Sequence, residues 1–348
     1  MLSCLAHADT QFQISGDYWQ VPEQTLRYQP NYSTIYPWHP TFASGKIASE
    51  YEIANGFDVA FKARYNQIDG AYFDQASIGY HDVGYGVRLG ILPYRITWCE
   101  TYDFNSVWAR EPDAYCSFRK LADSASGAVG AQVYKTLILN DWAVDTQLSF
   151  FKPTILNQSN TQGGIYVLTG TNTFDQRYGA SVNAMHLPSA AQFRLGFIST
   201  TQEINGTNPR RFKYDTYFLG AEYNPIDSLT LKFTQLMYVG GQYATTSSLL
   251  DYVSSSRTLS AVYEITDKDK IGIAFSAVIN RTLYPQSHYA LQPLDVPSTS
   301  LSYRHDFDRG VFVITEYIKS SSYYLPLNAK VAQVYSGSSL GVKLGFNY

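Results

Sequence analysis

The sequence predicts an all-β fold, a transmembrane antiparallel β-barrel of sixteen strands. Three observations support this prediction. Apolar and polar residues alternate with a period of two along most of the chain, which is typical of strands with one apolar face. Short and long connections between these strands follow one another in turn. The chain has no run of about 18 apolar residues that would form a membrane-spanning helix, although 16% of its residues are aromatic.

The clearest alternation lies at the end of the chain, in residues 339–348, which read SLGVKLGFNY. Every second residue of this segment is apolar, and the last of them is Tyr348. Residues 57–66, 84–91 and 270–280 alternate in the same way. One face of each strand would contact lipid and the other would contact water, so a barrel needs no continuous apolar segment.

The alternating segments and the turn residues between them indicate sixteen strands. The expected strands are residues 10–19, 45–53, 57–67, 74–81, 84–92, 127–138, 142–151, 177–187, 191–201, 214–224, 228–239, 255–265, 270–281, 297–306, 310–319 and 338–348. Connections from an even-numbered strand to the next are short and carry turn residues, as at Asn140–Asp141. Connections from odd-numbered strands are longer. Membrane barrels have short periplasmic turns and long external loops, so both chain ends would lie on the periplasmic side.

The longest connection, residues 93–126, is the third of the long loops. No linker or second domain is evident, and residues 9–348 are expected to form a single barrel domain. Residues 1–8 are interpreted as the remnant of a secretory signal peptide, because Ala6-His7-Ala8 has the small-x-small form of a signal-peptidase site. An ordinary disordered terminus is the alternative.

The composition excludes several classes of function. Charged residues make up 16% of the chain, below the roughly 25% of soluble domains. The net charge of -3 excludes a strongly basic nucleic-acid binder. The sequence has no G-x-S-x-G or H-E-x-x-H motif and no paired His/Cys cluster. We therefore predict no catalytic residue, no metal ligand and no cofactor.

Two of the three cysteines, Cys99 and Cys116, lie in the long connection. Two cysteines close in sequence in an exported chain indicate one disulfide. The bond would contribute on the order of 3 kcal/mol in the chain-entropy model. Two free thiols are the alternative.

The architecture resembles that of the general porins of Gram-negative outer membranes. The features that carry the resemblance are the sixteen strands, the long third loop, the segment Gly86–Gly90 that runs into this loop, and the C-terminal strand that ends in Tyr348. Many members of the family end in Phe, and the loop sequence typical of enterobacterial porins is absent. The resemblance implies a homotrimer in the bacterial outer membrane, surrounded by lipid, with a water-filled channel for small hydrophilic solutes and ions. It also implies a third loop that folds inward and narrows the channel.

In general porins, basic residues on the channel wall face acidic residues on the loop. By this resemblance, the basic wall would consist of Lys46, Lys62, Arg64 and Arg88. The acidic residues of the loop would be Glu100, Asp103, Glu111 and Asp113. A transverse field between the two groups would orient dipolar solutes. The alternative is that the inward charges are only solvated, since any wet lumen needs polar residues.

Three other functions stay open at this point. A substrate-specific porin for phosphate, another anion or sugars would share the architecture, with loop aromatics such as Trp98 and Trp108 as a stacking surface for sugars. A barrel enzyme would need a nucleophile beside an oriented base, and none of the six His shows such a spacing. A soluble all-β adhesion or binding protein would also alternate, but would have no reason to sort its loops by length.

Overall fold

A computed structural model describes residues 7–20, 35–54, 56–66, 70–92, 98, 106–109, 128–152, 172–204, 210–244, 250–283, 294–324 and 333–347. These residues contain sixteen strands, as the sequence predicts. The strands are β1 (His7–Gln20), β2 (Ile35–Ala54), β3 (Phe57–Asn66), β4 (Gly70–Asp82), β5 (Tyr85–Leu92), β6 (Ala128–Leu139), β7 (Trp142–Lys152), β8 (Asn172–His186), β9 (Ala191–Ile204), β10 (Arg210–Ile226), β11 (Leu229–Ala244), β12 (Leu250–Glu264), β13 (Asp269–Leu283), β14 (Leu294–Asp306), β15 (Val311–Tyr324) and β16 (Gln333–Asn347).

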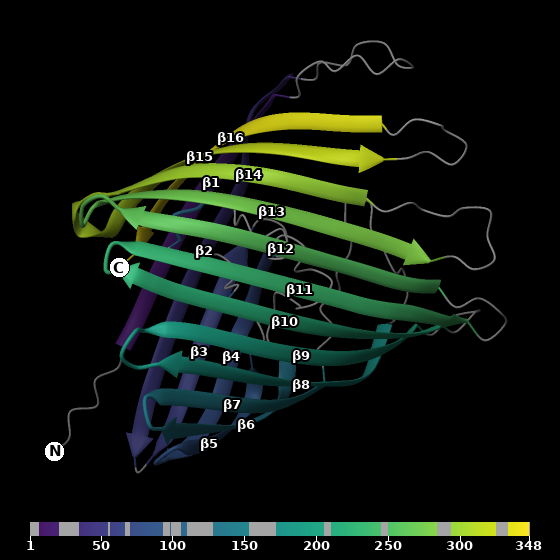
Figure 1. The fold of residues 1–348 in the computed structure, drawn as a ribbon. Coiled ribbons are helices and arrows are strands. Elements are labelled where there is room, and N and C mark those ends of the chain that lie inside the picture. Colours follow the sequence, from purple (N-terminus) through teal and green to yellow (C-terminus); the bar gives the residue numbers. More distant parts are fainter. Residues whose placement is uncertain are drawn as a thin grey trace.

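The strands form one antiparallel sheet that closes on itself. Each strand pairs with its neighbours in the sequence, and β1 pairs with β16, for example at Ile14 and Leu344. Figure 1 shows β8–β14 crossing in front of β1–β5, so the two groups form opposite walls of the barrel. Closure leaves no strand edge unpaired, which is the condition for a sheet to lie in lipid.

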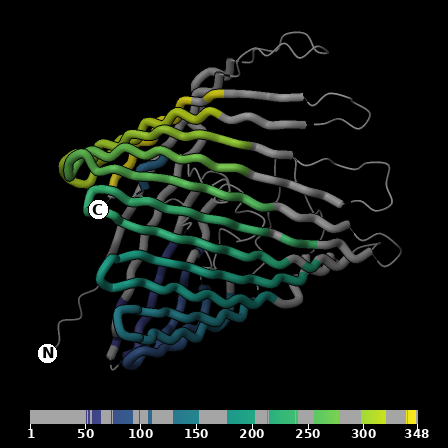
Figure 2. Tube along the Cα trace, in the orientation of Figure 1, coloured from purple at the N-terminus to yellow at the C-terminus, as the bar shows by residue number. Residues whose placement is uncertain are grey.

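The short connections lie at one end of the barrel, where the chain trace turns back on itself (Figure 2). After each even-numbered strand the turn has two to four residues, as the strand bounds show. Gly56, Gly84 and Gly310 have positive φ angles in these turns, a conformation that costs glycine little. The end of β16 lies at the same side, because Phe346 pairs with Val311 directly after the β14–β15 turn.

Most strands are longer than predicted. β2 begins at Ile35 instead of residue 45, and β16 begins at Gln333 instead of residue 338. Pro37 and Pro40 interrupt the alternation in β2, and its register with β1 shifts nearby, which is why the pattern understated this strand. β1 begins at His7, two residues before the predicted start of the domain.

The outer face of the sheet is apolar and exposed, and the inner face is polar and mostly buried. In β13, Ile271, Ile273 and Phe275 are exposed, whereas the alternating Gly272, Ala274 and Ser276 are buried. β16 repeats this pattern, with Leu344 exposed by 56% between buried neighbours. Such a continuous apolar surface is unfavourable in water, which indicates that the outer face needs an apolar environment.

Among the described residues, apolar side chains inside the barrel pack in small clusters and not in one core. One cluster joins Leu92, Phe151 and Ile198 of β5, β7 and β9. The others lie where residues 106–109 contact the wall. Among the described residues, none belongs to a helix long and apolar enough to cross a membrane.

Candidate functional site in the barrel lumen

A segment of the long loop, residues 106–109, lies against the inner face of β14. Arg304 Nη1 donates a hydrogen bond to the carbonyl oxygen of Ser106 at 2.8 Å. The Ser302 hydroxyl, on the same strand, donates to the carbonyl oxygen of Val107. Arg304 and Ser302 are both buried. The two bonds are therefore shielded from water and fix the backbone of the segment.

A third donor comes from β16, on the far side of β15. Lys343 Nζ donates to the carbonyl oxygen of Trp108 at 3.1 Å, and Lys343 is buried. A hydrogen bond with a charged donor contributes about 1.5–3 kcal/mol. Three successive carbonyl groups of the loop are thus held by three side chains of the wall.

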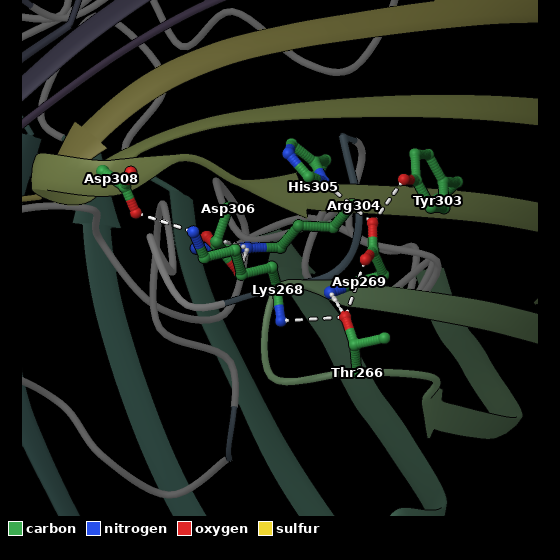
Figure 3. Close-up of polar contacts among 8 residues, drawn as sticks. All are labelled: Thr266, Lys268, Asp269, Tyr303, Arg304, His305, Asp306 and Asp308. Carbon is green, nitrogen blue, oxygen red and sulfur yellow. Dashed lines mark hydrogen bonds and ion pairs between the residues drawn. The ribbon is translucent and has the colours of Figure 1, made fainter.

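The position of Arg304 is itself fixed by the wall. Its guanidinium donates to the Asp306 carboxylate from Nε at 2.9 Å and from Nη2 at 2.6 Å (Figure 3). The guanidinium also lies over the Phe312 ring, 4.2 Å from its centroid. Asp306 balances the charge of the buried arginine, and the planar guanidinium keeps Nη1 directed at the loop.

The side chains of the segment pack on β12 and β13. Val107 and Trp108 are buried with Ala274, and Val262 packs against them. A Cβ atom at Gly272 would come within 2.7 Å of the Trp108 ring and 2.9 Å of the Val107 side chain. The missing side chain at this position therefore makes room for the indole.

A second loop residue, Trp98, contacts the wall at β10 and β11. A Cβ atom at Gly220 would come within 2.6 Å of the Trp98 ring. The ring meets Phe218 edge to face at 6.0 Å, and Lys232 Nζ lies 5.5 Å from the ring centroid. The loop thus contacts the wall at β10–β11 and again at β12–β16. This confirms the prediction that the third loop folds into the lumen.

The opposite wall carries a group of charged side chains. Asp58 of β3 is only 3% exposed. One of its carboxylate oxygens lies 3.7 Å from Arg88 Nε, and the other lies 3.3 Å from His81 Nδ1. The Arg88 guanidinium also lies 5.7 Å from the centroid of the Tyr134 ring. Asp58 and Arg88 hold each other in place on the inner face.

Further basic residues line the inner face between β3 and β8. Lys62 is 6% exposed on the inner face of β3. Arg177 of β8 is buried, and its Nε donates to the Thr200 hydroxyl of β9 at 2.8 Å. Together with Arg88, these residues place three cations along the inner face of β3–β8.

The inner face of β11–β14 carries a row of small hydroxyl side chains at one level. Thr234, Thr258, Ser276 and Ser298 occupy directly paired positions across these four strands. The two serine hydroxyls are 2.5 Å apart. Short uncharged side chains leave space for the loop, which lies on this side of the barrel.

The structure places two of the eight predicted site residues on the inner wall, Lys62 and Arg88. Lys46 and Arg64 are paired with each other across β2 and β3, and only their backbone positions are described. The other predicted residues lie outside the described part of the chain: Glu100, Asp103, Glu111, Asp113, Cys99 and Cys116.

The sequence reasoning missed the role of Arg304 and Lys343 as anchors of the loop. Their positions in alternating strands indicate an inward direction, but their partners are backbone carbonyls 198 and 235 residues away in sequence. No side-chain pattern encodes such a partner. Among the described residues, no group of three or more His, Cys, Asp or Glu side chains could hold a metal ion.

We compared the chain with protein families, curated sequences and solved structures. No protein-family model and no curated protein sequence matches the chain. The chain is similar to the outer-membrane channel DcaP of Acinetobacter baumannii, with a TM-score of 0.63 and 9% identity over 99% of this chain and 97% of that one. It is also similar to an anion-selective porin from Comamonas acidovorans, with a TM-score of 0.59 and 13% identity over 98% of this chain and 100% of that one.

The chain has the fold of an outer-membrane porin. A third similar structure is the trimer form of OmpT, an outer membrane protein of Vibrio cholerae. Its TM-score is 0.59, and its identity is 11% over 99% of both chains. At these identities the likeness concerns the porin fold alone, and the chemistry of the channel must be argued from the residues of this chain.

Proposed function

We propose that the protein is a porin of the bacterial outer membrane, through which small hydrophilic solutes and ions diffuse passively. The observation that carries the proposal is the loop segment 106–109, which is fixed inside a barrel with an apolar outer face. A loop held at this place narrows the channel without blocking it. Solutes then pass according to their size and charge, with no chemical step.

The outer face supports the membrane location. Large apolar side chains are exposed along the strands, including Leu195 of β9, Leu259 of β12 and Leu301 of β14. Tyr223 and Tyr263 are exposed near the short turns, where an aromatic girdle is expected at a membrane surface. The short turns then face the periplasm.

The two walls of the lumen support a narrow passage along β3–β8. The loop packs on the hydroxyl-bearing wall of β11–β14 and on β14–β16, so the charged wall stays on the other side of it. Arg88, whose side chain is the most exposed of the described cations on this wall, would contact passing solutes there, and Asp58 would hold it in place. The predicted acidic residues of the loop, Glu100, Asp103, Glu111 and Asp113, would face this wall and complete the constriction.

A porin specific for anions is the second candidate. The described inner face of β3–β8 holds three cations, Lys62, Arg88 and Arg177, and two carboxylates, Asp58 and Asp145. Such an excess of cations attracts phosphate, sulfate or carboxylate solutes. Addition of phosphate should then block chloride current at millimolar concentration, whereas a general porin would show no block.

The described residues do not assemble the parts of a hydrolase. His186 Nδ1 lies 2.7 Å from the Ser189 hydroxyl, but both residues belong to the β8–β9 turn and its edge, away from the lumen. A serine nucleophile with a histidine base needs a third group, usually a carboxylate, that orients the imidazole. In the described part of the chain no carboxylate contacts His186. A transport function without a chemical step is therefore favoured.

Single-channel conductance of the refolded chain in a planar bilayer under a salt gradient tests the proposal. Stepwise open levels are expected, and the sign of the reversal potential will report whether cations or anions pass more easily. Migration on a denaturing gel with and without heating shows that the barrel is folded. A folded, inserted protein without conductance would contradict the porin function.

A further inference from the structure

A histidine lies within the charged group on the inner face of β3–β5. His81 belongs to the inward-facing row of β4, together with Ser77 and Gly79, which are both buried. Ile78 and Tyr80 alternate with this row on the outer face and are exposed. The His81 side chain is 43% exposed, so its imidazole is accessible to water in the lumen.

A missing side chain lets a carboxylate reach this histidine. Gly79 is paired with Asp58 of β3 and with Arg88 of β5, and a Cβ atom at Gly79 would come within 2.5 Å of the Asp58 carboxylate. The carboxylate therefore lies over β4, where one oxygen is 3.3 Å from His81 Nδ1 and the other is 3.7 Å from Arg88 Nε. The Tyr134 ring, 5.7 Å from the Arg88 guanidinium, borders the group on the side of β6. His81 is thus held beside a buried carboxylate that already has a cationic partner.

The charged positions around His81 do not cancel when its imidazole is neutral. Residues that are directly paired across strands lie on the same face of a sheet, so the register identifies the inward positions of β2 from those of β3. The charged residues at inward positions nearby are Glu50 and Glu52 of β2, Asp58 and Lys62 of β3, and Arg88 of β5. Three acids and two bases leave one negative charge in this part of the wall.

Protonation of His81 would cancel this charge. Histidine is the side chain whose ordinary pKa places its change of charge between pH 5 and 8, whereas carboxylates, lysine and arginine ordinarily keep their charges there. A protonated imidazole has an N–H group on both nitrogens, so Nδ1 can donate to Asp58 whichever tautomer the neutral ring has. The position of His81 therefore suits both of its charge states.

We propose that His81 makes the ion selectivity of the channel depend on pH, so that its protonated form passes more anions relative to cations than its neutral form. The proposal rests on the proposed porin function. His81 lies at the periplasmic end of the lumen, because its backbone N–H donates to the carbonyl oxygen of Gly56 in the β2–β3 turn at 2.8 Å. Ions would meet this charge where the lumen opens to the periplasm. Acid in the medium would then weaken the attraction of the channel for cations.

Reversal potentials at two pH values test the proposal. The refolded full chain would be measured in a planar bilayer under a gradient around about 0.1 M salt, where a charge acts over about 10 Å. For an ion that passes about 8 Å from the imidazole, Coulomb's law with this screening gives about a twofold rise in the ratio of anion to cation permeability between about pH 8 and pH 5.5. An unchanged ratio in a conducting native channel would overturn the proposal.

Substitutions of His81 assign the pH effect to this residue. His81→Gln has a polar side chain that does not titrate, and it should conduct with the same permeability ratio at both pH values. His81→Lys should show the acid value of the ratio already at the higher pH. If His81→Gln keeps a shift as large as that of the native channel, another group causes the effect and the proposal is wrong.

The matched control is a histidine on the outer face. His186 alternates with the exposed Tyr178 and Val182 on the outer face of β8, and its ring centroid lies 4.8 Å from that of Trp142. His186→Gln should keep the full shift between the two pH values. Equal losses of the shift in His81→Gln and His186→Gln would show that the lumenal position of His81 is not the cause, and would contradict the proposal.

Charged labels test the position of His81 at constant pH. In a background where Cys4, Cys99 and Cys116 are serine and the conductance is native, His81→Cys would be modified with a cationic or an anionic methanethiosulfonate reagent. The cationic label should raise the ratio of anion to cation permeability, the anionic label should lower it, and neither label on His186→Cys should change it. Shifts of the same sign from both labels would show that the charge at this position does not set selectivity.

This inference and the porin function fail in different ways. A folded, inserted protein without conductance contradicts the porin function, and the role of His81 with it. A conducting channel whose selectivity is the same at both pH values refutes the role of His81 alone and leaves the porin function standing.

Discussion

The indole of Trp108 lies on Gly272, where a Cβ atom would come within 2.7 Å of the ring. This contact joins the middle of the long loop to β13, and the carbonyl groups on either side of it are held by Arg304 and Lys343. The position of the loop in the lumen therefore depends on one missing side chain and on donors from two other strands. Each of these dependences can be tested separately.

Replacing Gly272 by Val should displace the loop. The new side chain would overlap the Trp108 ring and the Val107 side chain, and neither can move toward the wall. Overpacking of this kind typically costs about 1–3 kcal/mol. We expect an altered single-channel conductance with larger current fluctuations, while the barrel stays folded on a gel without heating.

The matched control for this prediction is Trp108→Ala. Removing the indole alone should also free the loop, but adding Gly272→Val to Trp108→Ala should have little further effect, because the two changes act through one contact. Additive effects of the two substitutions would show that Gly272 acts through something other than the indole.

Replacing Lys343 by Met should leave the Trp108 carbonyl without its charged donor. The bond is buried, so its loss should cost about 1.5–3 kcal/mol of loop anchoring. Faster fluctuations of the open current are expected at unchanged ion selectivity. Lys319→Met, on the outer face of β15, is the control and should conduct like the native chain. A native current trace from Lys343→Met would mean that this bond does not hold the loop.

The sequence predicts the barrel better than it predicts the lumen. The alternation in residues 270–280 identifies Ile271, Ile273 and Phe275 as outward-facing, and all three are exposed. This prediction succeeds because the two-residue period of a strand and the contact of one face with lipid are visible in residues that are neighbours in sequence. The position where the loop contacts the wall could not be predicted in this way. Gly272 resembles any inward glycine of a strand, and a backbone carbonyl such as that of Trp108 has no sequence signature. For the charged wall, strand alternation predicts the inward direction of Lys62 and Arg88, whereas their role in a constriction was implied by the resemblance and stays a prediction. The pairing of Arg88 with Asp58 needed the register of β3–β5.

Replacing Leu344 by Arg should destabilise the barrel. Leu344 is 56% exposed on the outer face and lies in β16, which closes the sheet against β1. A cation on the lipid face costs about 2–4 kcal/mol at the middle of the bilayer and about 0–1 kcal/mol near its surface. Leu344 pairs with Val313 close to the β14–β15 turn, so a loss toward the lower end of this range is expected. Urea unfolding in lipid vesicles, followed by tryptophan fluorescence, measures the loss. Leu344→Phe keeps the face apolar and should unfold like the native chain, and equal stability of the Arg variant would argue against lipid at this face.

Replacing Lys62 by Glu should shift ion selectivity toward cations. Lys62 faces the lumen on β3, and its reversal replaces one of the three described cations of this wall by an anion. The reversal potential in a salt gradient should move toward the value for cations, and Lys62→Gln should give an intermediate shift. Lys135→Glu, on the outer face near a turn, changes the same charge away from the lumen. If both reversals shift the potential equally, Lys62 does not line the passage.

An ion pair joins the turn before β13 to the turn before β15, and its contribution to the stability of the fold should depend on pH. Lys268 Nζ lies 2.7 Å from the Asp308 carboxylate (Figure 3). The hydrogen bond from Lys268 and its charge lower the pKa of Asp308 below its ordinary value. The pair therefore stabilises the fold above the ordinary carboxylate pKa of about 3.9, and this contribution disappears as the pH falls through the lowered pKa of Asp308. Both side chains are exposed, so the effect will be small and will weaken with salt.

The difference in urea midpoint between the native chain and Asp308→Asn should be constant from about pH 5 to 8 and vanish in acid. In a Lys268→Met background, Asp308→Asn should change little at any pH, and a persistent difference there would assign the effect to another partner of Asp308.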